Sequence, residues 1–404
     1  MNWNPFAVFT ASRDAPPSAR STELDRLIAK IDGANKASAG VSVTTESALR
    51  VAVVLACVRV IAEGVGQLPL RIYKRDGDQR APVRDDPIAT LLSRFPNEYQ
   101  TGFEFRETLT MHAALTGNGV AVKTRNNRGQ VVELLPLAPA QYVIKQAADY
   151  SLVYEARDAQ NRKIGDLTTA DVLHIRGPSW NSYSGMDAVA QAREAIGLTI
   201  AAEKSQGRLH KNGARPAGVL TTDQTVNADV VGRLREEWKS KFTGDDQHGT
   251  AVVDGGWKYQ AMSMTGVDAQ HLETRRFQIQ DVCRAFNVFP QMVMETSGTS
   301  TYASAESFFS AHVRHTLKPW LARWAQAVDR DLLDKRGPLE CDFETREMTK
   351  AATADREKFI RTVVETGVMT RNEVRALEGL APLPGLDDPL TPLNMTTGTS
   401  PAPE

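Results

Sequence analysis

Residues 268–290, DAQHLETRRFQIQDVCRAFNVFP, carry the pattern that decides how this chain is organised. Apolar side chains recur there at the spacing of one helical face: Leu272, Ile279, Val282 and Phe286. The pattern predicts one long helix that stops at Pro290, although Arg275 lies within the apolar face. A loop with almost no bulky groups follows at 295–302 (ETSGTSTY), and a second amphipathic helix is expected over 303–333. The order of a helix, a loop without bulky side chains and a second helix suits a mobile polar loop in a space through which another molecule slides. The same order is a poor design for a catalytic pocket.

The composition limits the function classes. The chain has 404 residues, with 48 basic and 49 acidic side chains and a net charge of −1, which is not the balance of a basic nucleic-acid binder. The three cysteines form no CxxC pair, so a thiolate zinc site is not expected. Cys57 and Cys283 lie in apolar helical contexts and are expected to pack as small hydrophobic residues. No secretory signal is visible, and the apolar run 51–58 is too short to span a bilayer, so we expect a soluble intracellular protein without a membrane partner.

The remaining periodicity predicts an α+β chain. Helices are expected over 47–63 (ended by Gly64 and Gly66), 102–116 (ended by Gly117), 186–211, 228–242, 350–366 and 370–379. Strands are expected as three hairpins, over 68–83, over 119–137 and from 151 to a return strand near Lys163, as a short strand at 170–177, and on both sides of the 228–242 helix, which gives a βαβ-like insert. Pro319 must bend or break the second amphipathic helix, because proline removes a donor and crowds the preceding turn.

Motifs that would indicate an enzyme are absent from the sequence. It contains no GxxxxGK[ST] phosphate loop, no GxGxxG after a strand, and no GxSxG or HExxH. His312 and His315 form an HxxH pair without a third ligand nearby, and His174 is expected to be structural. The carboxylate pairs Asp245-Asp246 and Asp387-Asp388 point apart along the chain and are expected to be solvated. We therefore expect no catalytic residue, no cofactor and no metal.

Several blocks, in order and spacing, resemble the portal (head–tail connector) proteins of tailed bacteriophages. They are ALRVAVVLACVRVIAEGVGQLPLRIYKR (48–75), the block that begins FPNEYQTGFEF (95–137), GMDAVAQAREAIGLTIAAEKSQGRLHKNGARPAGVL (185–220), residues 268–293, the aromatic-rich helix through HTLKPWL (315–321), and TRNEVRALEGLAPLPGLDDPLTPLNM (370–395). The siphophage lineage and gene-transfer-agent-like portals are the most similar. The stretch 291–294 (QMVM) departs from the family, which has a second proline and a Leu-Leu-Gly there.

The resemblance implies the portal fold, with long stem helices, a small clip insert, a β-rich wing and a helical crown. Its segments would be a flexible arm at 1–41, the wing at 42–185, the first stem helix at 186–214, the clip at 215–264, the second stem helix at 265–288, the tunnel loop at 289–303, a long helix between wing and crown at 304–336, the crown at 337–380, and an extended tail at 381–404.

The resemblance also implies a function and partners. Such proteins form a homo-oligomeric ring, usually of twelve subunits, at one vertex of the capsid, through which double-stranded DNA passes during packaging and ejection without being read by sequence. The implied partners are the terminase large subunit, which supplies ATP hydrolysis, a head–tail adaptor and the major capsid protein. The protein would reside in the virion after assembly in the host bacterial cytoplasm, and would perform no catalysis.

Three groups of residues follow as candidate sites. The DNA-facing tunnel loop comprises Thr296, Ser297, Gly298, Thr299, Ser300 and Thr301. The clip docking surface comprises Trp238, Lys241 and Phe242, although a plain solvated helix face explains this segment as well. The expected subunit interface comprises Phe308, Phe309, Trp320 and Trp324, more aromatic surface than one helix–helix contact needs.

The tunnel loop carries hydroxyl groups and a glycine but no lysine or arginine, which suits a conduit. DNA carries one charge about every 1.7 Å, and each cation that pairs with a phosphate adds grip. On the residues alone, a plain surface loop between helices remains an alternative. Two further readings stay open: a nucleic-acid enzyme, which would need clustered carboxylates for metal ions, and an adaptor or scaffold protein of the same particle without a channel.

Overall fold

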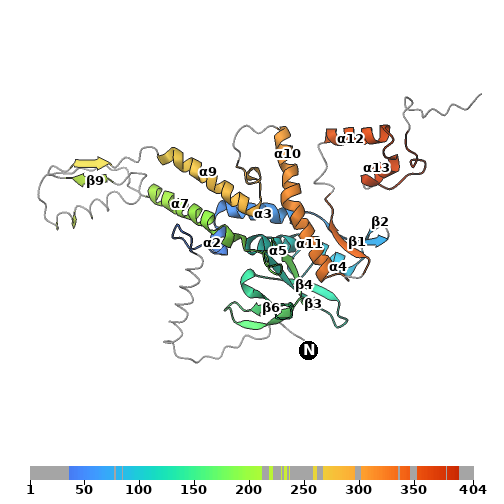
Figure 1. Ribbon diagram of the computed structural model, residues 1–404, viewed down its shortest axis with the longest axis horizontal. Coiled ribbons are helices and arrows are strands. Elements are labelled where there is room, and N and C mark those ends of the chain that lie inside the picture. Colours follow the sequence, from blue (N-terminus) through green and yellow to red (C-terminus); the bar gives the residue numbers. More distant parts are fainter. Residues whose placement is uncertain are drawn as a thin grey trace, which may run out of the picture. The chain divides into compact units, whose positions relative to one another are not determined.

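The computed structural model describes residues 36–76, 79–83, 85–211, 218–221, 229, 232–233, 236, 258–261, 267–295, 302–334, 337–345, 353–378 and 380–390. The chain divides into two compact units, Met1–Phe343 and Glu344–Glu404. Helices and antiparallel sheets are mixed in the first unit, as the α+β prediction requires (Figure 1). Among the described residues, no helix combines the length and apolar character that a membrane crossing requires.

The core of the first unit is helical. Helices α3 (Ala52–Gly66) and α5 (Gly102–Thr116) pack together, and α9 (Val267–Phe286) packs on α3 (Figure 1). The side chains buried in this layer are apolar and include Val54, Val58, Ile61, Phe105, Leu109 and Val282. Helix α5 begins at the capping box of Thr101 and Glu104 and ends at Gly117, whose positive φ of 80° closes the helix where the sequence predicted.

Two predicted helices are each divided. Residues 45–66 form α2 (Thr45–Leu49) and then α3, which includes Gly64 and ends at Gly66, the second of the two glycines expected to end it. A Cβ atom on Gly64 would lie 2.7 Å from Cδ2 of Leu317, so this glycine permits close approach of another segment. The helix predicted from 186 is likewise divided into α6 (Ala188–Gln191) and α7 (Arg193–Lys211). Helix α7 runs alongside α9 (Figure 1).

The first sheet contains a strand from far along the chain. Strands β1 (Leu70–Asp76) and β2 (Gln79–Val83) form the predicted hairpin. Strand β11 (Leu339–Phe343) adds to the other edge of β1, with Ile72 opposite Cys341. This pairing places 339–343 in the first unit, and the boundary between the two compact units lies after Phe343.

Two further sheets lie next to each other and share a core. Strands β3 (Asn118–Arg125), β4 (Val131–Leu137) and β8 (Val172–Arg176) form one antiparallel sheet in the order β4-β3-β8. Strands β5 (Tyr142–Gln146), β6 (Leu152–Arg157) and β7 (Lys163–Thr168) form the other. Val120, Tyr142, Tyr154 and Val172 bury one common cluster between the two sheets. The hairpins predicted in this region are confirmed.

The insert differs from its prediction. Strands β9 (Gly218–Thr221) and β10 (Lys258–Ala261) pair antiparallel, whereas a βαβ unit pairs its strands in parallel. The expected βαβ-like arrangement is therefore wrong for these strands. The predicted docking residues Trp238, Lys241 and Phe242 lie outside the described residues.

The second unit contains α12 (Thr353–Glu365) and α13 (Arg371–Leu377), and the predicted capping box of Thr370 and Glu373 begins α13. The tail expected to be extended from 381 instead returns onto α13 over 381–390. The Asn372 amide group donates to Leu383 O (2.8 Å) and to Asp387 Oδ1 (2.7 Å), and its Oδ1 accepts from Leu383 N (2.9 Å). Residues 391–404 lie outside the described part.

Candidate functional site

The candidate site is the connection between α9 and the helices that follow it. The predicted tunnel-loop residues 296–301 lie outside the described residues, but the segments on both sides are described. These segments are 282–295 and 302–321, and we call them the loop frame. They fix where the loop begins and ends, so their packing decides how firmly it can be held.

Helix α9 ends earlier than the sequence predicted. Its last residue is Phe286, because Asn287 adopts a left-handed conformation with φ of 54° that a continuing helix cannot include. Pro290 begins a short 3-10 turn, Pro290–Val293. Met294 follows with a positive φ and a side chain that is 94% exposed. The chain therefore turns twice before it reaches the predicted tunnel loop.

On the far side of the loop, the second long helix is interrupted where proline was expected to bend or break it. It comprises α10 (Tyr302–His312), a five-residue π-helical segment (Val313–Leu317) and α11 (Lys318–Asp331). The N–H of Lys318 donates to Val313 O, five residues earlier. Pro319 has no N–H, so it cannot supply the α-helical bond to the carbonyl of His315.

Asn287 satisfies that carbonyl from the end of α9. Its Nδ2 donates to His315 O at 3.0 Å, and Thr316 Oγ1 donates to Asn287 O at 2.6 Å. The two bonds join the end of α9 to the π-helical segment. The loop thus leaves and returns to segments that are fastened to each other.

Helix α3 provides the base on which the loop frame packs. Cys283 of α9 and Cys57 of α3 are both buried, as predicted, with their Sγ atoms 3.8 Å apart. The hydrogen bond between the thiols and their burial raise the pKa of Cys57, so it is protonated at neutral pH. Two helical turns further along α3, Leu317 of the π-helical segment contacts this helix at Gly64. Both sides of the loop frame therefore contact one helix.

The polar side of α9 faces α7, which explains the arginine within its apolar pattern. Arg275 is exposed and lies 3.9 Å from Glu203 Oε1 and 3.3 Å from Gln206 Oε1, both on α7. Arg276 lies 3.6 Å from Glu295 at the edge of the loop frame. These exposed pairs contribute little to stability, and their effect is to orient the two helices.

The structure separates the four aromatic residues predicted for a subunit interface. Phe308 is partly buried, and Phe309 is 43% exposed. Trp320 is only 7% exposed and Trp324 is completely buried. Trp324 Nε1 donates to Thr110 Oγ1 at 2.9 Å, and its ring packs edge-on against another aromatic ring of α5. The interface prediction is therefore wrong for Trp324, because α5 of the same chain already covers its side chain.

The HxxH pair offers no metal centre. His312 is almost fully buried, and burial lowers its pKa, so it is neutral near pH 7. No group of three or more histidine, cysteine, aspartate or glutamate side chains that could hold a metal ion occurs in the described part of the chain.

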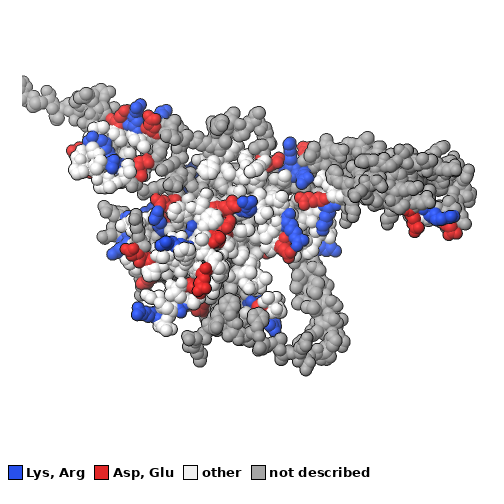
Figure 2. Space-filling model, turned by 180° about the vertical axis from the view of Figure 1, so that it is seen from behind, with Lys and Arg blue, Asp and Glu red and all other residues white. Residues whose placement is uncertain are grey.

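Basic and acidic side chains lie interspersed on the face drawn in Figure 2, with uncharged residues between them.

The sequence and the fold of this chain are similar to those of known proteins. The sequence model of the phage portal protein family matches residues 52–379. The chain is 28% identical over 352 residues to the portal protein of Enterobacteria phage HK97, covering 86% of this chain and 82% of that protein. It is 29% identical over 385 residues to the probable portal protein of Streptomyces phage phiC31, covering 91% and 83%. The fold resembles that of a chain in the neck of a native gene transfer agent particle computed with C12 symmetry, with a TM-score of 0.59 and 22% identity over 89% of this chain and 99% of that one.

Proposed function

This chain belongs to the phage portal protein family, and we propose that it closes into a ring that conducts double-stranded DNA into and out of a capsid. The observation that carries this proposal is the loop frame. The end of α9 and the π-helical segment are bonded to each other through Asn287 and rest on α3, so the helices on both sides of the loop are held together.

The chemistry of the loop supports a sliding contact. Residues 296–301 are threonine, serine and glycine only. Hydroxyl groups contact phosphates weakly or through water, whereas each lysine or arginine would add an ion pair that must break with every step of the DNA. A net charge of −1 and the interspersed charges of Figure 2 fit the same requirement.

The ring requires a head-to-tail interface that closes on itself. Phe309 supports such an interface, because it is an exposed aromatic residue on α10. We propose twelve subunits, following the C12 symmetry with which the gene transfer agent neck was computed. In this assembly Phe308 and Phe309 would contact the neighbouring subunit, while Trp320 and Trp324 are already largely covered within their own chain.

The proposed partners follow from this role. Terminase and later a head–tail adaptor would dock on the insert around Trp238, Lys241 and Phe242, and the major capsid protein would surround the ring in the virion. The chain itself would perform no catalysis. Its sequence contains no phosphate-binding loop, so a separate enzyme would supply ATP hydrolysis.

Replacement of the loop tests the proposal. Deletion of 296–301 should leave rings assembled but reduce packaged or retained DNA, because the frame bonds stay intact while the contact with DNA is lost. A matched replacement of these six residues by glycine and serine, which keeps length and neutrality, should retain most packaging. DNA-filled heads at the wild-type level from the deletion variant would contradict the proposal.

A further inference from the structure

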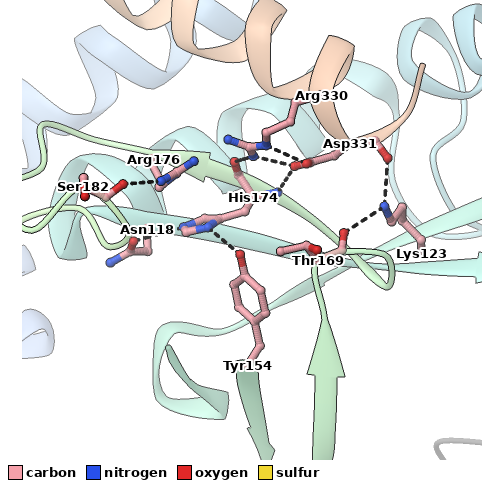
Figure 3. A network of polar contacts seen from close by, with 9 residues as sticks. All are labelled: Asn118, Lys123, Tyr154, Thr169, His174, Arg176, Ser182, Arg330 and Asp331. Carbon is pink, nitrogen blue, oxygen red and sulfur yellow. Dashed lines mark hydrogen bonds and ion pairs between the residues drawn. The ribbon is translucent and has the colours of Figure 1, made fainter. Parts of the chain in front are cut away.

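A cavity of about 370 Å³ lies in the first unit, away from the loop frame. Strands β3, β6 and β8 and the end of α11 enclose it (Figure 3). Its lining is rich in basic side chains: Lys123, Arg125, Arg176 and Arg330, with Asp331 as the single acidic residue. Leu152, Tyr154 and Val172 form an apolar wall.

One of the four cations is already neutralised. Arg330 forms an ion pair with Asp331, in which Nη2 lies 2.6 Å from Oδ2. Asp331 Oδ2 also accepts the backbone N–H of His174 at 3.0 Å. The only carboxylate in the lining is therefore committed to partners within the wall (Figure 3).

The other three cations bond to neutral carbonyl oxygens. Lys123 Nζ donates to Asp331 O at 2.8 Å and Arg176 Nη1 donates to Ser182 O at 2.7 Å. Arg125 donates to two carbonyls, Gly129 O at 2.8 Å and Ala170 O at 3.1 Å. These bonds fix the side chains but cancel no charge, and both guanidinium groups keep further donors, since each has five. The carboxylates of Asp331 and, more weakly, Asp171 act on Lys123 without bonding to it, and the Asp171 carboxylate accepts from Thr168.

Burial makes this concentration of charge costly. Lys123 is 7% exposed, and desolvation lowers its pKa; desolvation also lowers the pKa of Arg176, with Arg330 adding to the effect. An anion in the cavity would offset the cost of burying the charges of Lys123 and Arg176.

The wall beneath the cations is held rigidly. Tyr154 OH bonds to His174 Nδ1 at 2.9 Å, and His174 Nε2 bonds to Asn118 Oδ1 at 3.1 Å (Figure 3). The Asn118 Oδ1 atom also accepts the N–H of Gly185 at 2.9 Å. A preformed wall of this kind spares a ligand the entropic cost of ordering the site.

We propose that this cavity binds the phosphate group of a nucleotide-sized ligand. Lys123 and Arg125, two residues apart on β3, supply several donors for one tetrahedral oxyanion, and guanidinium groups bind phosphate through paired hydrogen bonds. Arg176 lies on the other side of His174 (Figure 3) and would bind a second polar group of the ligand. The apolar wall at Tyr154 would receive the organic part of the ligand. A volume of about 370 Å³ falls in the range of small-ligand sites. The site is separate from the proposed conduit and does not depend on it.

Calorimetric titration of the full-length protein at constant ionic strength tests the assignment, with inorganic phosphate, deoxyadenosine monophosphate and a short DNA duplex as three separate probes. Phosphate and the nucleotide should bind, the nucleotide more tightly because it also uses the apolar wall. Arg125→Gln and Arg176→Gln should each weaken nucleotide binding about tenfold, the share of one charge-assisted hydrogen bond. Arg128→Gln removes the same charge from the neighbouring β3–β4 turn, outside the lining, and should leave binding unchanged.

Substitution by lysine separates charge from geometry. Arg125→Lys keeps the charge but loses the planar pair of donors, so it should bind more weakly than wild type and more strongly than Arg125→Gln. If Arg176→Gln fails to fold because its bond to Ser182 is lost, the Arg125 series decides alone. The absence of phosphate and nucleotide binding, binding of the duplex only, or an equal loss in Arg128→Gln would overturn the proposal.

Discussion

The side-chain amide of Asn287 donates a 3.0 Å hydrogen bond to the carbonyl oxygen of His315. This is the carbonyl to which Pro319 cannot donate, so an asparagine 32 residues earlier supplies the hydrogen bond that the proline leaves out. The left-handed conformation of Asn287 both ends α9 and aims its amide at the π-helical segment. One residue thereby joins both sides of the predicted tunnel loop.

The variants Asn287→Gly and Asn287→Ala measure how much the hydrogen bond from Asn287 to His315 stabilises the folded protein. The glycine variant keeps the left-handed backbone and loses the amide, so it should lower the free energy of unfolding by about 1 kcal/mol, the net worth of one hydrogen bond. The alanine variant loses the same bond and should cost about 1 kcal/mol more, because alanine is strained at positive φ. Urea unfolding of both variants checks the order. Equal stability of Asn287→Gly and wild type would show that the bond does not hold the frame.

Substitution of Trp324 should lower the stability of the subunit, whereas substitution of Phe309 should weaken its assembly. Trp324→Phe leaves Thr110 Oγ1 without its donor and should destabilise the isolated subunit by about 1–3 kcal/mol in urea unfolding. Phe309→Ala removes an exposed ring and should change subunit stability by less than about 0.5 kcal/mol while weakening assembly, as seen by sedimentation velocity. A Trp324→Phe subunit of unchanged stability that no longer assembles would reverse our assignment of both residues.

His174 should contribute a distinct pH dependence. Burial lowers its pKa in the folded protein from 6.5 to about 3, so the unfolded chain binds the proton more readily between these values. The stability of the native state is therefore complete above pH 6.5 and declines as the pH falls from 6.5 toward 3, by up to about 1.4 kcal/mol per pH unit.

The variant His174→Gln isolates that contribution. Carboxylates titrate in the same acidic range, so the quantity to compare is the slope of unfolding free energy against pH between 6 and 4, measured for wild type and variant. The wild-type slope should be the steeper of the two. Identical slopes would mean that His174 is accessible to protons in the folded protein.

The sequence predicted elements well where their signals are local. The α5 helix ends at Gly117 and α13 begins at the Thr370 capping box, because each signal and its consequence lie within a few residues. The pairing of β1 with β11 could not be predicted, since its partners are more than 250 residues apart. Gly64 was misread for the same reason: the Leu317 side chain that needs its space comes from a distant helix.

The candidate site shows the same division. A stripe of aromatic residues at helical spacing indicates that Trp324 is covered, but it does not say whether the same chain or a neighbour covers it. The hydrogen bond of Asn287 had a signal in the sequence. An asparagine directly follows a helix, and a proline lies four residues after His315, whose carbonyl oxygen accepts the bond from Asn287. The cationic cavity had none, because Lys123, Arg176 and Arg330 are brought together only by the tertiary fold.

Electron-microscopic class averages of the purified full-length protein test the central claim most directly. If neighbouring copies close around a channel, the averages should show rings with an open central hole and twelvefold symmetry. Solitary particles without a hole, even at high protein concentration, would contradict the account.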